Sequence, residues 1–338
     1  MAYITLKTPT SESHINIGFE FTEFKTQIGK SQVVIITDSN INSIYGSQFS
    51  EFKVIEIKPG EKSKSLEIIG DIYKHLLDCH IDRNGLIIGI GGGVVCDITG
   101  FVATTYFRGI RFGFVATTLL AQVDAAIGGK NGVNFQSFKN IIGTINQPDF
   151  VYCDPKMLDS LPDEQYRCGM AEAIKTSLTR NNKLFDFIDE NKELIISKEY
   201  SVLQKLIYDS VKIKVSIVEA DEIEKGARKI LNLGHTFAHA IESKTGMQHG
   251  EAVSIGVCKA ADISLKLGFL ADEENKRIRE LFKGFGLPTE FKFDFEELLP
   301  AILHDKKKDE QIINYILLNG IGKPVIMKFH YNELKKIF

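Results

Sequence analysis

Ile87-Ile-Gly-Ile-Gly-Gly-Gly-Val-Val-Cys-Asp-Ile-Thr-Gly-Phe101 joins an apolar, β-branched run to a helical segment through three consecutive glycines. Glycines let backbone amides come close to a ligand, and the N-terminus of a helix favours phosphate oxygens. The spacing is not GxGxxG, so the familiar dinucleotide fingerprint is absent. The stretch predicts either a phosphate-binding turn or a tightly packed junction between a strand and a helix.

Short apolar runs on either side of this stretch alternate with helical patterns. Strands are expected at residues 32–37, 52–57, 85–90, 112–116 and 150–154, and a helix at residues 66–79. Strands separated by helices of this length imply a parallel, doubly wound, Rossmann-like sheet. We expect this α/β domain to cover residues 1–155.

The second half of the chain has a different character. Long amphipathic helical patterns cover residues 162–179, 183–196, 200–224, 229–244, 250–267 and 272–285. Patterns of this length predict a mainly α-helical second domain over residues 156–338.

The composition is that of an ordinary globular protein. Of the 338 residues, 43% are hydrophobic and 25% charged, and the formal net charge of −3 offers no basic excess for nucleic acid. The N-terminal residues lack a signal-peptide pattern, and no apolar run is long enough to cross a membrane. Five scattered cysteines without a CxxC motif fit a reducing compartment, so we expect a cytoplasmic protein.

Polar residues follow several of the predicted strands. The segments Asp38-Ser-Asn40, Glu61-Lys-Ser-Lys64 and Ala116-Thr-Thr-Leu-Leu120 lie where the crevice of an α/β sheet opens. Each segment alone fits a solvated turn, but together they favour a bound nucleotide. Asp97, in the first turn after the glycines, either complements the helix dipole or accepts hydrogen bonds from a cofactor.

A second donor-rich segment runs from Gln122 to Asn134 and is followed by Lys139 and Asn140. Its lysines lie among glycines and asparagines, which predicts a flexible lining suited to an anionic substrate. The alternative, an exposed loop, is disfavoured because Val123 and the residues after it are too apolar.

Three of the eight histidines fall within fifteen residues of one another. Helical spacing places His235 and His239 on one face, His249 follows, and neutral imidazoles are good zinc ligands. Upstream, Glu172 and Lys175 lie in an otherwise apolar helical run, where a buried carboxylate needs a partner such as a metal. The pattern predicts a metal site, and spacing alone does not decide which of the imidazoles bind the ion.

A series of motifs in a fixed order is shared with a known family. They are Gly91-Gly-Gly-Val-Val-Cys-Asp97, Tyr106-Phe-Arg-Gly109, Thr117-Thr-Leu-Leu-Ala-Gln-Val-Asp124, Gly128-Gly-Lys130, Lys139-Asn140, Gly169-Met-Ala-Glu-Ala-Ile-Lys175, Asp221-Glu-Ile-Glu224, Arg228 with Asn232-Leu-Gly-His-Thr-Phe-Ala-His239, His249-Gly-Glu251 and Asp305-Lys-Lys307. From about residue 32 to 325 the chain closely resembles the 3-dehydroquinate synthase family of sugar phosphate cyclases.

The chain departs from the family pattern at a few positions. Cys96 and Ala238 stand where the family usually has glycine, and Asn131 and Ser160 where it usually has threonine. The segment Asp305-Lys-Lys-Lys308 lacks the glycine that often follows. These changes concern fine cofactor geometry, because the residues that match the family's ligands are intact.

The resemblance implies an NAD-binding domain followed by a helical domain that holds Zn²⁺ or Co²⁺. By the family pattern the metal ligands are Glu172, His235 and His249, and His239 faces the substrate phosphate. The NAD-binding set implied by the resemblance is Asp38, Asn40, Glu61, Lys64, Gly92, Gly93, Val94, Asp97, Thr117, Thr118, Leu120, Asp124, Lys130, Lys139 and Ser160.

The resemblance also implies a substrate site and a homodimer. The substrate-lining set is Asp124, Lys130, Asn140, Lys175, Lys214, Glu224, Arg228, Asn232, His239 and one of Lys306 and Lys307. Arg108 would reach the phosphate across the dimer. Bland alternatives exist for some of them: Lys175 could extend along an apolar helix face, Glu224 and Arg228 could form a surface ion pair, and Lys306–Lys308 could be a solvated charge run.

The implied activity is conversion of 3-deoxy-D-arabino-heptulosonate 7-phosphate, a phosphorylated sugar acid, into 3-dehydroquinate and phosphate. This is a shikimate-pathway reaction in which NAD is used transiently and emerges unchanged. Three alternatives remain: a cyclase that makes an inosose or valiolone ring, a metal- and NAD-dependent polyol dehydrogenase, or a catalytically silent binding protein. Nucleic acid and membrane partners are not expected.

Overall fold

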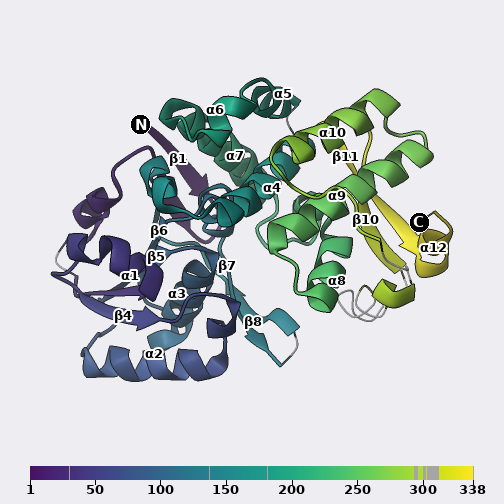
Figure 1. The fold of residues 1–338 in the computed structure, drawn as a ribbon. Helices are drawn as coiled ribbons and strands as arrows, with labels where there is room; N and C mark the ends of the chain where they lie inside the picture. The colour runs from purple at the N-terminus through teal and green to yellow at the C-terminus, as the bar shows by residue number, and fades with distance from the viewer. Residues whose placement is uncertain are drawn as a thin grey trace. The chain divides into compact units, whose positions relative to one another are not determined.

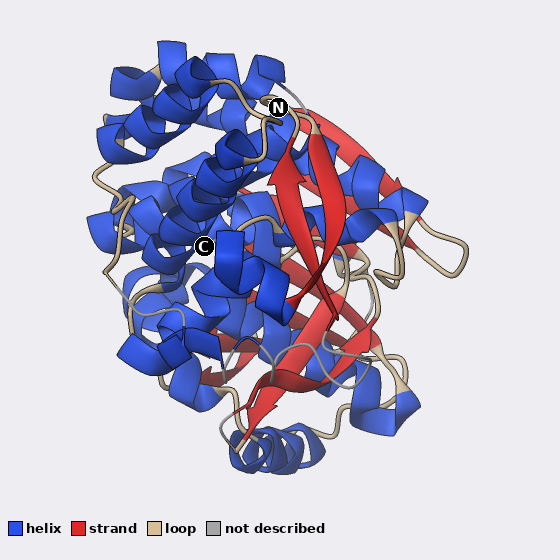
Figure 2. Cartoon of the chain, turned by 90° about the vertical axis from the view of Figure 1, so that its right-hand side faces the viewer, coloured by secondary structure: helices blue, strands red, loops and turns tan. Residues whose placement is uncertain are grey.

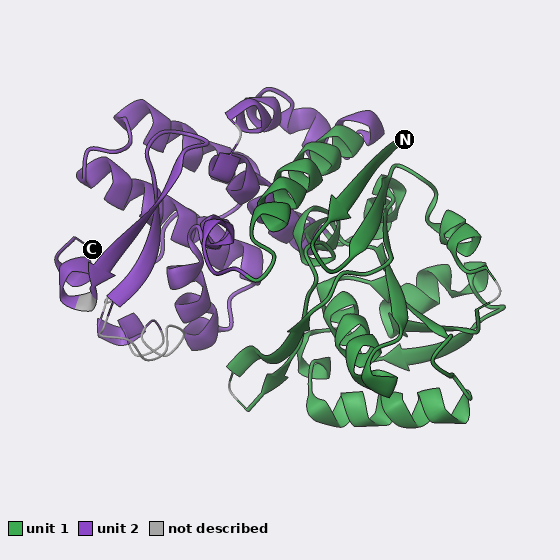
Figure 3. Ribbon diagram, turned by 180° about the vertical axis from the view of Figure 1, so that it is seen from behind, with its two compact units in different colours: residues 1–162, 203–223 green, residues 163–202, 224–338 purple. Residues whose placement is uncertain are grey.

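The computed structural model describes residues 1–29, 31–136, 138–180, 182–292, 296–299, 302 and 312–337. The chain forms two compact units (Figure 3). The first comprises Met1–Pro162 and Leu203–Ile223, and the second comprises Asp163–Val202 and Glu224–Phe338. The domain boundary expected near residue 155 stays a prediction. The two units do not follow a single boundary, because Leu203–Ile223 group with the first unit.

A seven-stranded sheet forms the centre of the first unit (Figure 1). Its order is β1-β2-β9-β6-β5-β3-β4, with β1 antiparallel to β2 and the other pairs parallel. The strands are β1 Ala2–Lys7, β2 Glu12–Ile17, β3 Val33–Asp38, β4 Lys53–Ile57, β5 Leu86–Gly91, β6 Arg111–Ala116 and β9 Phe150–Cys153. The Rossmann-like parallel sheet expected from the sequence is confirmed.

Helices and short turns connect or follow these strands, and one later helix joins the same unit. The helices are α1 Ser39–Tyr45, α2 Leu66–Asp78, α3 Gly93–Thr105 and α7 Tyr200–Ala220, of which α7 enters the first unit at Leu203. The short turns are η1 Phe21–Gln27, η2 Gly46–Gln48, η3 Glu61–Ser63, η4 Tyr106–Arg108, η5 Ala121–Ala125 and η6 Pro155–Ser160. Helix α3 packs on β5 and β6, and most of its side chains are buried.

The chain reverses its direction across the sheet between β3 and β5. These strands are neighbours, but β4 lies beyond β3 and β6 lies beyond β5. Their carboxyl ends therefore flank a topological switch point, where α/β proteins bind ligands. Asp38 ends β3 and Gly91 ends β5, and Thr37 Oγ1 donates a hydrogen bond to the Ile90 carbonyl at 2.7 Å.

A second, two-stranded sheet occupies the segment expected as a flexible lining. The residues from Ala121 form the π-helical turn η5, and then β7 Lys130–Phe135 pairs antiparallel with β8 Phe138–Ile145. Asn131 secures the base of this hairpin, since its side-chain amide donates to the carbonyls of Gly129 and Asn146 at 2.9 and 3.0 Å. Backbone pairing and these bonds order a glycine- and asparagine-rich segment that has weak strand propensity.

The second unit is mainly helical. Figure 2 colours the helices of the whole chain blue and its strands red. Its helices are α4 Asp163–Arg180, α5 Asn182–Glu190, α6 Lys192–Ile196, the turn η7 Ala227–Asn232, α8 His235–Thr245, α9 His249–Lys266, α10 Asp272–Gly284 and α12 Tyr331–Ile337. Helix α9 is its centre, since it contacts α4, α8 and α10. The hairpin of β10 Ile312–Leu318 and β11 Pro324–His330 packs beside these helices and was not expected from the sequence.

Close packing of α9 depends on a glycine next to a candidate ligand. A Cβ atom at Gly250 would meet the backbone of Cys168 in α4. Glycine at this position therefore lets the first turn of α9, which begins at His249, lie directly against the helix that carries Glu172. Among the described residues, no helix is long and apolar enough to cross a bilayer.

Candidate functional site

The glycine-rich turn after β5 brings backbone amides to the carboxyl end of the sheet. Gly92 is the N-cap of α3, and no side chain of the described residues caps this helix. The amides of its first turn remain available to bind an anion. A Cβ atom at Gly92 would lie 2.9 Å from the Thr118 side chain, and one at Gly93 would lie 3.2 Å from that of Ala125. Side chains at these positions would fill the cradle.

Two threonines follow β6 at the same end of the sheet. Thr118 Oγ1 accepts a hydrogen bond from the Ala121 amide at 3.1 Å. Thr117 is buried, and within the described part of the chain its hydroxyl has no hydrogen-bond partner. A buried hydroxyl in this state requires an explanation, and a bound polar group would supply it. The turn and Thr117 thus fit the phosphates and hydroxyls of a nucleotide.

Asp38 caps the helix that follows β3. Its Oδ1 accepts hydrogen bonds from the amides of Asn40 and Ile41 at 2.9 and 3.1 Å. Burial raises the pKa of Asp38 despite these two bonds. At the other end of α1, Tyr45 and Ser160 are joined by a hydrogen bond of 2.8 Å between their hydroxyls. Asp38 and Ser160 therefore each have a structural partner, and their role toward a cofactor stays a prediction.

A polar network links η3, α3 and the β7–β8 hairpin. The buried Lys64 donates to Asp97 Oδ2 at 2.6 Å and also to Asn140 Oδ1. Glu61 lies beside them, with one carboxylate oxygen 3.7 Å from the Lys64 ammonium. Burial raises the pKa of Asp97, and the charge of Lys64 opposes this effect. The structure thus brings four of the predicted site residues into one cluster.

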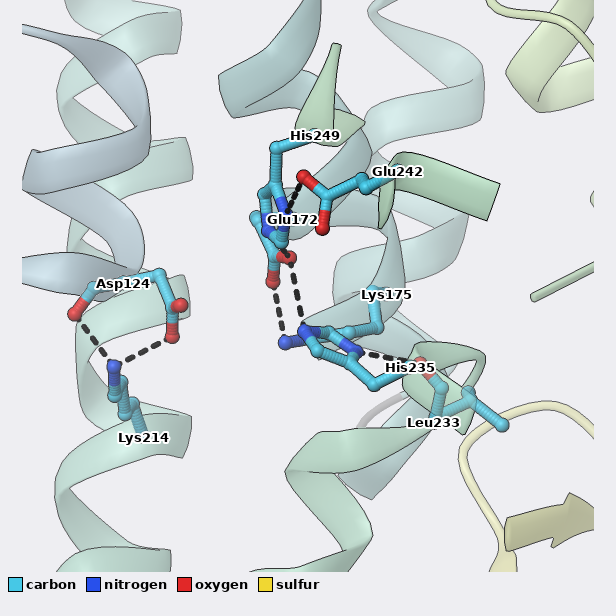
Figure 4. Close-up of polar contacts among 8 residues, drawn as sticks. All are labelled: Asp124, Glu172, Lys175, Lys214, Leu233, His235, Glu242 and His249. Atoms are coloured by element: carbon cyan, nitrogen blue, oxygen red, sulfur yellow. Dashed lines mark hydrogen bonds and ion pairs between the residues drawn. The ribbon is translucent and has the colours of Figure 1, made fainter. Parts of the chain in front are cut away.

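Asp124 and Lys214 form the second polar pair of the first unit, shown at one side of Figure 4. Lys214 in α7 donates to both the backbone oxygen and Oδ1 of Asp124, each at 2.5 Å. Gln122 fixes the π-helical turn that carries Asp124, since its buried side chain donates to the carbonyls of Ala116 and Asp154, each at 2.9 Å. Single π-helical turns often occur at functional sites.

The other predicted residues of the first unit lie at the ends of its helices, turns and strands. Val94 lies in the first turn of α3, and Leu120 precedes η5. Lys130 and Lys139 are exposed at the start of β7 and in β8. Arg108 is exposed in η4, with a left-handed backbone conformation of φ 66°.

The second unit contains a cluster of metal-ligand type built from three helices. Glu172 in α4, His235 in α8 and His249 in α9 each offer one ligand atom, and these atoms lie within 4.8 Å of one another. Glu172 Oε1 is 3.1 Å from His249 Nε2 and 3.6 Å from His235 Nε2 (Figure 4). Two imidazoles and a carboxylate are a common ligand set of catalytic zinc sites, which keep a position open for a substrate oxygen.

The other nitrogen of each imidazole is held by a neighbouring oxygen. His249 Nδ1 lies 3.1 Å from Glu242 Oε1, and His235 Nδ1 lies 3.2 Å from the Leu233 carbonyl. An Nδ1–H that donates to such an oxygen leaves the Nε2 lone pair for a metal. Both Nε2 atoms face Glu172, as a shared ion requires. The sequence did not identify Glu242 as part of the site, although it follows the histidine pair in the same helix.

Charges around the cluster favour an ionised Glu172. Burial by itself raises the pKa of Glu172, but the charge of Lys175 and the contact with His249 outweigh it and hold the pKa well below its usual range. Burial lowers the pKa of His235 to about 3. Burial also opposes a charge on His249, yet the contacts with Glu172 and Glu242 raise its pKa to about 10. An ionised Glu172 and a neutral His235 are thus ready to bind a cation, and a cation bound at His249 Nε2 would displace the proton that Glu172 and Glu242 favour there.

Lys175 and His239 lie beside this cluster. Lys175, one helical turn after Glu172, is buried and forms an ion pair with Glu172 Oε2. Its alternative, extension along an apolar helix face toward solvent, does not hold. The ring of His239 is 5.2 Å from that of His235, measured between centroids, and is not one of the three converging groups. The structure therefore groups the histidines as the family resemblance implies.

Glu224, Arg228 and Asn232 lie between α7 and α8. The Asn232 side chain donates to Glu224, and Arg228 is fully buried in η7, which packs against α4. Helix α7 ends at Ala220, so Glu224 and Arg228 do not share a helix, and the buried Arg228 does not belong to a surface pair. The remaining predicted residues, Lys306 and Lys307, lie outside the described residues.

Comparison with known protein structures defines the class of this fold. The structure of 2-epi-5-epi-valiolone synthase from Streptomyces hygroscopicus, with NAD⁺ and Zn²⁺ bound, is 24% identical and superposes with a TM-score of 0.88 over 100% of this chain and 98% of that one. A 2-deoxy-scyllo-inosose synthase structure, complexed with carbaglucose-6-phosphate, NAD⁺ and Co²⁺, is 25% identical, with a TM-score of 0.86 and 99% of each chain covered. The fold is that of the sugar phosphate cyclases.

Sequence comparison narrows the class to one family. Residues 54–168 match the model of the 3-dehydroquinate synthase N-terminal domain, and residues 169–308 match that of its C-terminal domain. The 3-dehydroquinate synthase of Leptospira interrogans is 40% identical over 321 residues, which cover 92% of this chain and 89% of the relative. The chain belongs to the 3-dehydroquinate synthase family.

Proposed function

We propose that the chain converts 3-deoxy-D-arabino-heptulosonate 7-phosphate into 3-dehydroquinate and inorganic phosphate, as a phosphate-eliminating lyase. The observation that carries the proposal is the convergence of Glu172, His235 and His249 in a chain of this family. A relative that is 40% identical over 92% of this chain is a 3-dehydroquinate synthase, the enzyme of the proposed reaction.

We propose that Glu172, His235 and His249 hold one Zn²⁺ or Co²⁺ ion, and that the first unit holds NAD. The two cyclase structures with the same fold contain NAD⁺ with one of these metals. A bound metal would polarise a hydroxyl and the ketone formed from it. The nicotinamide would take up a hydride and later return it, so that no NADH is released.

The chain's own residues would bind and orient the substrate. Lys130, Lys175 and His239 supply positive charge or donors for the phosphate, whereas Arg228 suits the carboxylate, which it can bind through two parallel hydrogen bonds. Lys214 in α7 donates to Asp124, and its ammonium would also bind the carboxylate of the substrate. This arrangement lowers the barrier through fixed charges and orientation.

In the first unit, backbone and hydroxyl groups would hold the dinucleotide. The amides after Gly92 would bind the phosphates, and Thr117 would donate a hydrogen bond from its buried hydroxyl. Asp97 and Lys64, which bond each other, would supply further polar contacts to the dinucleotide. The same chemistry supports Thr118, Asp38 and the other members of the predicted NAD set. Thr117 carries this part of the proposal, because a bound group would give its hydroxyl a partner.

We further propose a homodimer in which Arg108 reaches the partner's substrate phosphate. The exposed position of Arg108 in η4 supports this role. We also propose a cytoplasmic enzyme of the shikimate pathway, a location that the five free cysteines suit. Residues 1–155 and 156–338 are proposed as the NAD-binding domain and as the domain for metal and substrate.

The test is a turnover assay with the purified chain, the heptulosonate phosphate, NAD⁺ and zinc. We expect one phosphate per 3-dehydroquinate formed, without accumulation of the nicotinamide absorbance of NADH. Accumulating NADH would identify a polyol dehydrogenase instead. Turnover of a phosphorylated sugar that lacks a carboxylate, with no turnover of the heptulosonate, would identify an inosose- or valiolone-forming cyclase.

A further inference from the structure

An irregularity in the β7–β8 hairpin determines where two predicted site residues lie. Regular pairing runs as far as Val133 opposite Ile142 and resumes with Phe135 opposite Phe138. Asn134 alone on β7 therefore spans three residues on β8, the stretch from Lys139 to Ile141. Such bulges redirect side chains beside active sites. Asn140, inside this bulge, has a left-handed backbone conformation with φ 53°, which must be held by its neighbours.

Asn134 supplies the contacts that hold this bulge. Its Oδ1 accepts a hydrogen bond from the Asn140 amide at 2.8 Å, and its Nδ2 donates to Glu61 Oε1 at 2.8 Å. Its backbone amide donates to the Lys64 carbonyl at 2.8 Å. Because Lys64 also bonds Asn140 through its ammonium, Asn134, Lys64 and Asn140 form a closed ring of hydrogen bonds, and Glu61 joins this ring through Asn134.

We infer that Asn134 is a positioning residue that couples the cofactor-binding turn to the substrate-binding bulge. The inference rests on the proposed function, in which Glu61 and Lys64 contact NAD and Asn140 contacts the substrate. Bound NAD would hold the side chains of Glu61 and Lys64 in place. Through its hydrogen bonds, Asn134 would then hold the backbone of Asn140 in place as well. Each ligand would then bind more tightly in the presence of the other.

The ring uses both polar atoms of the Asn134 amide, one as acceptor and one as donor. Only a side chain with one acceptor and one donor can receive the Asn140 amide and also donate to the Glu61 carboxylate. An aspartate in place of Asn134 keeps the acceptor but faces Glu61 with a second negative charge. An alanine removes both contacts. The two substitutions therefore distinguish the contact with Asn140, on the substrate side, from the contact with Glu61, on the cofactor side.

The experiment measures, for the full-length metal-loaded protein, the Kd of NAD⁺ by calorimetry and the kcat and KM for the heptulosonate phosphate. Asn134→Ala should weaken NAD⁺ binding and raise the substrate KM, each about fivefold to tenfold, the effect of losing a net hydrogen bond or two. In the wild type the substrate KM should fall as the NAD⁺ concentration rises, and Asn134→Ala should abolish this dependence. Asn134→Asp should weaken NAD⁺ binding while its substrate KM at saturating NAD⁺ returns toward that of the wild type.

Asn42→Ala is the matched control, because the Asn42 side chain makes the same kind of amide-to-carboxylate hydrogen bond, to Glu56 at 2.6 Å, and neither residue belongs to the predicted site. It should leave Kd and KM unchanged. If Asn134→Ala behaves like Asn42→Ala, or if it lowers only the melting temperature, the positioning role is wrong while the proposed function stands. If the wild type neither binds NAD⁺ nor releases phosphate, the proposed function fails and the inference fails with it.

Discussion

His235 and His239 are one helical turn apart in α8, yet the structure gives them different surroundings. His235 faces Glu172 and has its Nδ1 held by a backbone carbonyl, whereas His239 lies beside the cluster. We expect His235→Ala to lose bound metal and turnover together, and His239→Ala to keep the metal while losing activity. Metal content of the purified variants, measured by atomic absorption, checks this. Equal loss of metal in both variants would make His239 a ligand.

Glu242 holds His249, a predicted metal ligand, and should influence the metal without touching it. Glu242→Gln keeps the size of the side chain but weakens the contact with His249 Nδ1. We expect metal affinity to fall by about 10- to 100-fold, the usual effect of losing such a partner. Competition with a chelator measures it, and Glu251→Gln, in the first turn of α9, is the control. Unchanged affinity in Glu242→Gln would show that His249 needs no support from this carboxylate.

The site shows both the reach and the limit of sequence patterns. The residue types and the i, i+4 spacing predicted a metal site, but only the family resemblance selected Glu172, His235 and His249 from the candidates. Contacts made through space, such as that of Glu242 with His249, have no fixed spacing in the chain. The carbonyl of Leu233 carries no signal at all, because every residue has one.

At the level of helices, Gly250 permits the approach of α9 to α4. We expect Gly250→Ala to push the two helices apart, because its Cβ would meet the Cys168 backbone. The free energy of unfolding should fall by about 1–3 kcal/mol, the usual effect of overpacking, and metal affinity should fall with it. Chemical denaturation and chelator competition measure these two effects.

Gly70→Ala in α2 is the control for this substitution. A Cβ atom at Gly70 meets nothing within 4 Å. Alanine there should raise the free energy of unfolding by up to about 1 kcal/mol, since glycine is a poor helix former. If Gly250→Ala were as harmless as Gly70→Ala, close helix approach would not be what positions His249.

Where the hydrophobic pattern along the chain is clear, most predicted ends of strands and helices lie within about one residue of the observed ends. Continuous apolar runs gave β3 and β5, which are buried on both faces. The β7–β8 hairpin was missed because its strands are rich in glycine and asparagine and are stabilised by pairing with each other. The edge strand β1 was missed because its alternating pattern is short and partly exposed.

On the scale of the whole chain, the two predicted ligands should stabilise the protein independently. The predicted metal ligands belong to the second unit and the predicted NAD residues to the first. At a hundred times its Kd, each ligand should add about 2.7 kcal/mol to the free energy of unfolding. Thermal melting should show that His235→Ala loses the zinc-induced shift and keeps the NAD⁺-induced one. Loss of both shifts in this variant would argue against separate sites.

The grouping of Leu203–Ile223 with the first unit could not be foreseen from the sequence. Helical periodicity identified α7 but says nothing about which core a helix joins. That choice follows from contacts across the chain, such as the one between Lys214 and Asp124, which are 90 residues apart in the sequence.

Anomalous diffraction from crystals of the zinc-loaded protein tests the central claim most directly. We predict one zinc peak at about 2.0–2.2 Å from Nε2 of His235, Nε2 of His249 and a carboxylate oxygen of Glu172, the usual distances for these ligands. A peak bound through His239 in place of one of these groups, or no peak within reach of Glu172, would contradict the account.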